Sequence, residues 1–137
     1  MATTSVIDKP PGSFAHVTRV LFVIVAYLLA LCILIQVFLA GLSIFGSPTF
    51  WALHTTFVRY FGSLPLLLII LAVSGRTRHA LVWFSLLLEV LIGLQYAFVY
   101  LPVSAIAALH PVNAVIMFWI TISVARRAMK LLKQGEY

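Results

Sequence analysis

The sequence predicts an all-α integral membrane protein folded as a four-helix up-and-down bundle. Hydrophobic residues make up 64% of the 137-residue chain, charged residues make up 9%, and the mean hydropathy is +1.15. A soluble domain contains about 25% charged residues. This composition excludes soluble enzyme folds, disordered tails and nucleic-acid-binding modules, and it makes the lipid bilayer the first expected partner.

Four apolar runs are each long enough to cross a membrane as a helix. Runs of about 22 to 26 residues give about 33 to 39 Å of helix, against a hydrocarbon layer of about 30 Å. The breaks between them are short, so consecutive helices are expected to be antiparallel neighbours. The predicted spans lie between an N-terminal segment, 1–19, and a basic tail, 126–137, and cover residues 20–45, 50–73, 80–101 and 103–125.

The fourth span is expected to begin near Pro102. A helix that began at Pro111 would have only about 21 Å of apolar length, too short to cross the hydrocarbon layer. Pro102 suits the first turn of a helix, while Pro111 becomes an internal kink that frees the carbonyl about one turn upstream. His110 is therefore predicted to lie inside the membrane.

The basic residues indicate the orientation of the bundle. Eight of the nine Lys and Arg residues lie before the first span, between the second and third spans, or after the fourth span. The two remaining loops carry none. The positive-inside rule therefore predicts a multi-pass membrane protein with both termini in the cytoplasm.

A weak internal repeat carries two histidines. Gln36 is followed by Ala-Leu-His ending at His54, and Gln95 is followed by Ala-Leu-His ending at His110, with Gln-to-His spacings of 18 and 15. His54 lies about 9 Å and His110 about 10 Å inside the outer ends of their spans. Since both spans run from outside to inside, the two imidazoles can face each other across the core, which predicts a metal site formed by His54 and His110 that fits a b-type haem.

Polar residues near the histidines have two readings. Asn113 and Met117 follow His110 at helical spacings, and Gln36 and Gln95 lie in the outer halves of the first and third spans. The three amide residues can be cofactor-binding side chains that hold the second ring nitrogen of each ligating imidazole. Alternatively, each amide bonds a neighbouring helix. Aromatic residues, Trp51 and Tyr100 among them, are interface anchors or line a cofactor pocket.

Arg59 and Glu89 are charges deep inside apolar helices. Each lies about 14 Å from an end of its span, which places both near the midplane of a core about 30 Å thick. We expect a buried ion pair between these residues on adjacent antiparallel helices. A proton or quinone site at Glu89 is the open alternative.

The stretch Leu109-His110-Pro111-Val112-Asn113-Ala114, with Gln36 and His54 upstream, resembles an uncharacterised family of small bacterial four-span membrane proteins. The chain is also similar, more loosely, to one half of the haem A synthase type of bundle, where paired histidines on alternate helices hold haem. It lacks the acid expected near the catalytic site of that bundle. The resemblance implies a four-helix, haem-binding bundle in a bacterial inner (cytoplasmic) membrane and gives no established reaction.

Two functions are consistent with these residues. The first is a small b-type cytochrome that passes electrons to a quinone or a larger redox partner, without a catalytic residue of its own. The second is a non-catalytic accessory subunit of a respiratory or photosynthetic complex that binds a chlorin pigment or no cofactor. Other membrane subunits or a second copy of the chain are expected partners. The single cysteine, Cys32, excludes an intramolecular disulfide and a c-type haem attachment, and is expected to be a packing residue.

Overall fold

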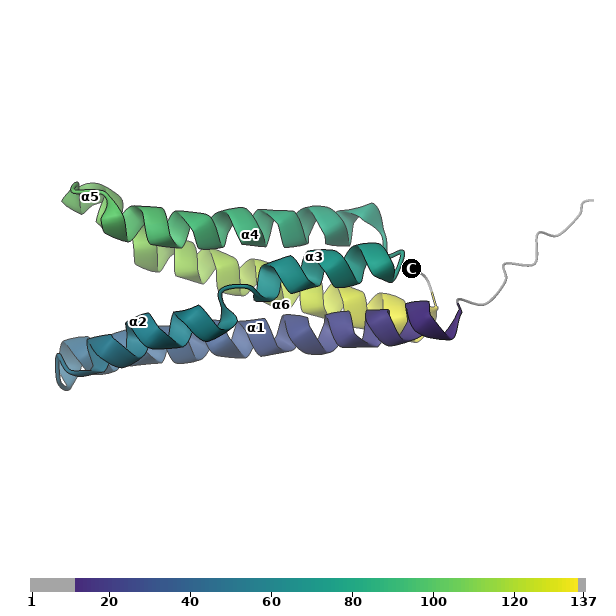
Figure 1. The fold of residues 1–137 in the computed structure, drawn as a ribbon, viewed down its shortest axis with the longest axis horizontal. Coiled ribbons are helices and arrows are strands. Elements are labelled where there is room, and N and C mark those ends of the chain that lie inside the picture. Colours follow the sequence, from purple (N-terminus) through teal and green to yellow (C-terminus); the bar gives the residue numbers. More distant parts are fainter. Residues whose placement is uncertain (1–11, 136–137) are drawn as a thin grey trace, which may run out of the picture.

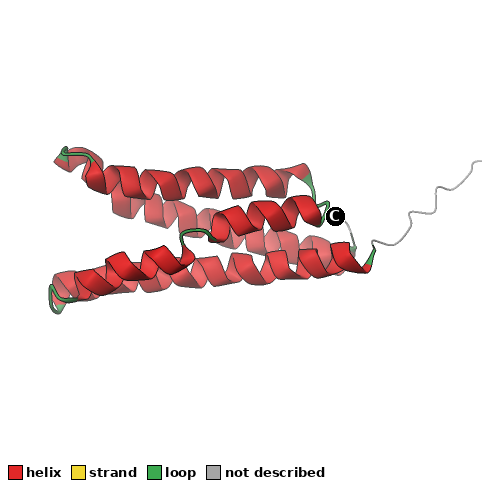
Figure 2. Ribbon diagram, in the orientation of Figure 1, coloured by secondary structure: helices red, strands yellow, loops and turns green. Residues whose placement is uncertain are grey.

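The computed structural model describes residues 12–135, which form helices joined by short turns and contain no strand (Figure 2). Four segments are long and apolar enough to span a membrane, which confirms the predicted fold class: 13–45, 50–74, 79–100 and 104–134. The helices are α1 (Ser13–Phe45), α2 (Phe50–Phe61), α3 (Leu64–Ser74), α4 (His79–Tyr100), α5 (Ser104–Ala107) and α6 (Leu109–Gln134).

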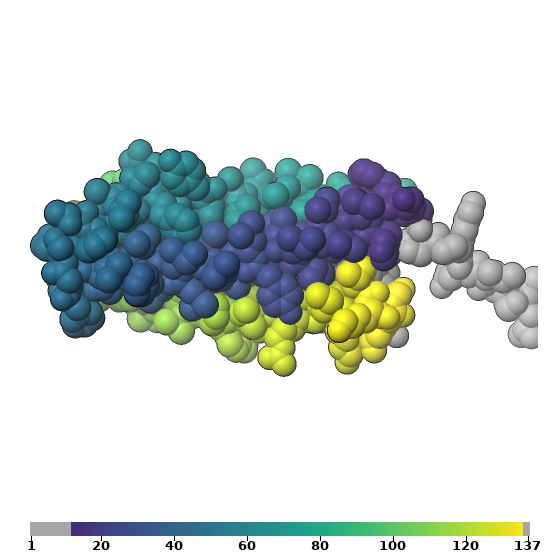
Figure 3. Space-filling model, turned by 90° about the horizontal axis from the view of Figure 1, so that it is seen from below, coloured from purple at the N-terminus to yellow at the C-terminus, as the bar shows by residue number. Residues whose placement is uncertain are grey.

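The four segments form an up-and-down bundle. α1 packs against α3 and α6, and α4 packs against the same two helices, so α3 and α6 occupy opposite corners. Both ends of the described chain and the turn between α3 and α4 lie at one end of the bundle, while α5 and the turn between α1 and α2 lie at the other (Figure 1). Seen from below, the last turns of α6 lie beside the first turns of α1 (Figure 3).

The core is built from two matching helical hairpins. Buried positions on α1 recur 59 residues later on α4, and buried positions from the end of α2 through α3 recur 56 residues later on α6. This spacing follows the helical period, which places such positions on one face. The repeat predicted from the two histidines therefore extends through the core. From α1 to α4, the matched buried positions are 22 with 81, 26 with 85, 29 with 88 and 33 with 92. From α2 and α3 to α6, they are 61 with 117, 65 with 121, 68 with 124 and 72 with 128.

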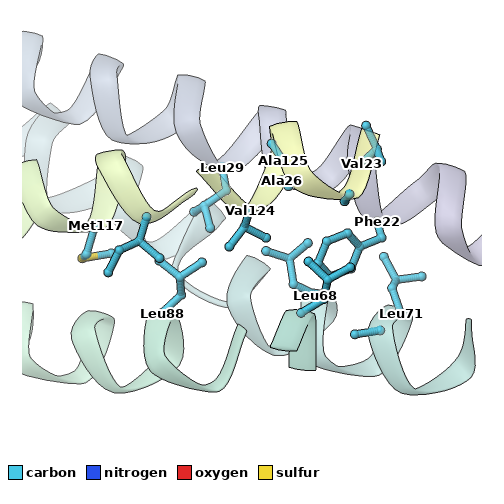
Figure 4. Close-up of a cluster of buried hydrophobic side chains, with 14 of the residues drawn as sticks. Phe22, Val23, Ala26, Leu29, Leu68, Leu71, Leu88, Met117, Val124 and Ala125 are labelled. Atoms are coloured by element: carbon cyan, nitrogen blue, oxygen red, sulfur yellow. The ribbon is translucent and has the colours of Figure 1, made fainter. Parts of the chain in front are cut away.

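Large apolar side chains close the core in the half of the bundle near the chain ends. Phe22 of α1, Leu68 of α3, Leu88 of α4 and Val124 of α6 belong to one buried cluster (Figure 4). The outer faces of the helices carry exposed apolar residues, such as Trp119, which is 70% exposed. A bundle surrounded by acyl chains has this distribution, because it has no need of a polar exterior.

Prolines interrupt two of the four segments. The second span was predicted to be continuous, but it breaks after Phe61, the last residue of α2. Pro65 lies four residues after Phe61, and a proline ring clashes with the carbonyl at that distance. Pro111 lies four residues after Ala107, the last residue of α5. The irregularity predicted about one turn before Pro111 is present, as a break between α5 and α6 rather than as a kink inside one continuous helix.

The first and last helices are longer than their apolar runs. α1 begins at Ser13 rather than at residue 20, and α6 continues to Gln134 rather than ending at residue 125. Hydropathy marks only the part of a helix that crosses hydrocarbon, and these helices extend beyond it. Gly135 follows the last residue of α6, and its φ of 70° provides a left-handed C-cap. Residues 1–11 of the predicted N-terminal segment and residues 136–137 of the tail lie outside the described residues.

Candidate functional site

His54 and His110 face each other across the bundle. Their ring centroids are 6.3 Å apart, with an angle of 54° between the ring planes. His54 lies on α2 and His110 on α6, in the two segments at opposite corners of the bundle. The rings of Trp51 and His54 pack edge to face, with their centroids 5.4 Å apart. The predicted juxtaposition of the two imidazoles is present in the structure.

Each imidazole is held by a main-chain carbonyl of its own hairpin. Nδ1 of His54 lies 3.0 Å from the carbonyl oxygen of Gln36, and Nδ1 of His110 lies 3.1 Å from the carbonyl oxygen of Gln95. A carbonyl oxygen only accepts hydrogen bonds, so Nδ1 is the protonated donor in both rings. In a neutral imidazole this leaves Nε2 with a free lone pair, the arrangement found in metal-bound histidines.

The side chains of Gln36, Gln95 and Asn113 do not hold the ring nitrogens of the histidines, although one interpretation of the sequence predicted that they would. Gln36 and Gln95 hold the imidazoles through their backbone carbonyls rather than through their side chains. Nε2 of Gln36 donates to the carbonyl of His54 at 2.9 Å. Nδ2 of Asn113 donates to Oε1 of Gln95 and to the carbonyl of Leu91, both at 2.8 Å. These side chains join neighbouring helices, as the alternative reading proposed.

A cavity of about 510 Å³ lies between the two hairpins. Its lining is mainly apolar and includes both histidines, Trp51 and Tyr96. The cavity exists because α2 packs along α1, whereas in residues 12–135 no comparable contact joins α2 to α4. The break after Phe61 allows α2 to follow α1 while α3 packs against both α1 and α4.

Arg59 and Glu89 do not form the predicted ion pair. Oε2 of Glu89 is buried without a hydrogen-bond partner, and Arg59 lies on the wall of the cavity with an exposed side chain. Matched depth placed the two residues at one level of the membrane, but α2 diverges from α4 at this level, so the prediction of a pair is wrong.

Three further observations concern groups that could bind a metal ion, the single cysteine, and a tyrosine in the wall of the cavity. Within residues 12–135, no group of three or more His, Cys, Asp and Glu side chains could hold a metal ion. Cys32 is free and buried, as expected for a packing residue. Tyr96 was not singled out from the sequence, although its position next to Gln95 at the level of the histidines was a usable signal.

The fold and the site together define a four-span membrane bundle with two histidines paired in its core. A family model described as "Family of unknown function (DUF6220)" matches residues 36–104, and since this is half of the chain, the protein belongs to that family. The matched region contains Gln36, His54 and Gln95 and ends before His110. No curated protein and no solved structure matches the chain.

Proposed function

We propose that the protein binds a b-type haem between His54 and His110 and serves in electron transfer, alone or as a subunit of a redox complex. In this proposal the protein lies in a bacterial inner membrane with both termini in the cytoplasm, and the haem lies near the outer face. The separation of the two imidazole rings carries the proposal.

The ring separation agrees with two imidazoles bound to one metal from opposite sides. A metal–imidazole bond of about 2 Å, and about 1 Å more from the ring nitrogen to the ring centre, put two such ring centres about 6 Å apart. The observed separation of the centroids is 6.3 Å. The hydrogen bonds at Nδ1 leave Nε2 of each ring as the ligating atom.

A haem suits this site better than a bare metal ion. Two imidazoles provide only two ligands, whereas a structural metal ion such as zinc takes four. A porphyrin supplies four nitrogen ligands itself, so the protein needs to add only the two axial ones. The cavity volume, about 510 Å³, falls within the range of about 300 to 1,000 Å³ typical of cofactor sites, and its apolar wall suits a porphyrin face.

The absorption spectrum of the purified protein tests the proposal. Bis-histidine haem b gives a Soret band and, after reduction, a sharp α band. We expect His54→Ala and His110→Ala each to abolish these bands. His79→Ala is the matched control, because His79 is exposed at the start of α4, and this variant should keep the full spectrum.

Each outcome of the spectrum is informative. A colourless protein that elutes as a single folded species, and that stays colourless when haem is added, would overturn the haem proposal and leave the role of a non-catalytic accessory subunit. Chlorin absorption lost in both histidine variants would also replace haem, in favour of an accessory pigment protein.

A further inference from the structure

We propose that Arg59 binds a carboxylate of the molecule held in the cavity, so that the ligand is an anionic tetrapyrrole rather than an uncharged one. This inference rests on the proposed haem site for the position of the ligand. It adds a requirement for charge that the two histidines do not impose.

Arg59 belongs to the wall of the same cavity as the two histidines. It follows His54 by five residues on α2, which is about 7.5 Å along the helix axis. Side chains of an α-helix lean toward its N-terminus, so a side chain as long as that of Arg59 can span this distance back toward the level of His54. A carboxylate at the edge of a molecule bound by the two histidines would therefore lie within reach of the guanidinium.

The chain provides no carboxylate for Arg59 among its described residues. It contains only three acidic residues, and of these only Glu89 lies in the described part, with no ion pair to Arg59. The other two lie outside residues 12–135, and no acidic residue lines the cavity. A guanidinium stays charged in any protein environment, and an unpaired charge within a membrane is costly.

The chemistry of the wall favours a carboxylate as the missing partner. A guanidinium presents two parallel N–H donors that match the two oxygens of a carboxylate. Haem b carries two propionate carboxylates at one edge of the ring, so one molecule can occupy both histidines and Arg59. Among the described residues that line the cavity, Arg59 alone carries a formal charge. Without a bound anion, this charge gives the cavity a positive potential.

A comparison of two ligands tests the inference. Iron protoporphyrin IX and its dimethyl ester share the metal and the ring but differ in the two carboxylates. Titration of the cofactor-free full-length protein in detergent, followed at the Soret band, should show the free acid binding on the order of 10 to 100 times more tightly than the ester. Arg59→Met should bind both ligands with the affinity that the ester has for the unchanged protein.

Two further variants complete the experiment. Arg76→Met is the matched control, because Arg76 lies in the turn between α3 and α4, away from the cavity, and it should keep the preference for the free acid. Arg59→Lys keeps the charge but loses the paired donors, so it should keep only part of that preference. The comparison of the two ligands on the unchanged protein needs no variant to fold.

The outcomes separate this inference from the proposed function. Equal binding of the acid and the ester by the unchanged protein would overturn the role of Arg59 and leave the haem site intact. Binding of neither ligand would overturn the proposed function itself. A preference for the acid that survives in Arg59→Met would also overturn the inference, because another group would then hold the carboxylates.

Discussion

At the scale of single residues, the two histidines are held in the same way by main-chain atoms. Each Nδ1 donates to the carbonyl of a glutamine on the first helix of its hairpin, α1 for His54 and α4 for His110. Oε1 of Gln36 is buried without a partner, whereas Oε1 of Gln95 accepts a bond from Asn113. The first hairpin has Phe57 at the position that corresponds to Asn113. The two halves of the site are therefore alike at the imidazoles and different one helical turn deeper.

Asn113 is expected to contribute to stability through its contact with α4. Its side chain is 5% exposed and joins α6 to the carbonyl of Leu91 and the amide oxygen of Gln95. Asn113→Leu removes the donor to Oε1 of Gln95 and to the carbonyl of Leu91, and should lower the free energy of unfolding by about 1 kcal/mol. Unfolding by titration with a denaturing detergent measures this change.

Thr55→Val is the control for this prediction. The hydroxyl of Thr55 bonds only carbonyls of its own helix and is exposed, so its removal should change the free energy of unfolding by no more than about 0.5 kcal/mol. Equal losses in the two variants would show that the contact between α6 and α4 contributes nothing specific.

The sequence predicted the histidine pair but not the atoms that hold it. Equal depth on two helices with the same direction was enough to place His54 opposite His110. The acceptors at Nδ1 are backbone carbonyls, which every residue has, so residue types could not identify them. Arg59 and Glu89 also had matched depths, but depth does not determine the separation of two helices, and α2 diverges from α4 there.

At the scale of helices, prolines fix the position of both interruptions. Each break ends a helix four residues before a proline: Phe61 before Pro65, and Ala107 before Pro111. The break in the second segment comes after His54, and the break in the fourth comes before His110. The two hairpins therefore carry their irregular backbone on opposite sides of the histidine level.

Pro65→Ala should join α2 and α3 into one helix. An alanine N–H at position 65 can donate to the carbonyl of Phe61, and the clash with the proline ring is removed. We expect amide hydrogen exchange over residues 61–67 to slow by about tenfold or more, which corresponds to about 1.4 kcal/mol of local stability. Mass spectrometry of peptides from the exchanged protein measures the effect.

Pro111→Ala is the reciprocal control, since it should slow exchange over residues 107–113 and leave residues 61–67 unchanged. Unchanged exchange over residues 61–67 in Pro65→Ala would mean that packing of α3 against α1 and α4 causes the break, rather than the proline.

Hydropathy predicted the four segments but not the break in the second one. Pro65 is surrounded by leucines, so a long apolar window includes it without a drop in mean hydropathy. The Gly-Ser-Leu-Pro stretch at 62–65 was the local signal of the break. Pro111 was recognised because the span would otherwise be too short, whereas no length argument pointed to Pro65.

At the scale of the whole molecule, the described basic residues other than Arg59 collect at one end of the bundle. The turn between α3 and α4, which contains Arg76, lies at the same end as the termini of the described chain (Figure 1). The opposite end consists of α5 and the turn between α1 and α2, and neither contains Lys or Arg. This distribution supports the proposed orientation.

Single-cysteine labelling tests the orientation in a Cys32→Ala background. Cysteines at Thr49 and Ser104 should react with an impermeant reagent added outside intact cells, and cysteines at His79 and Gln134 should react only after the membrane is opened. All four positions are exposed in the structure. A permeant reagent should label all four, and the parent without Cys32 should stay unlabelled. The reverse pattern would place the two histidines near the cytoplasmic face.

The lining of the cavity includes exposed residues of α2 and α4, such as Thr55, Arg59 and Tyr100, so the cavity is open to the surface of the bundle. In a bilayer this opening faces acyl chains rather than water. A ligand of the proposed site would then arrive by first dissolving in the membrane and moving sideways between the helices. Its local concentration depends on how strongly it partitions into lipid, so amphiphilic molecules gain access that equally well-fitting water-soluble molecules lack. The bilayer would thus act as the first filter for a ligand of the proposed histidine site.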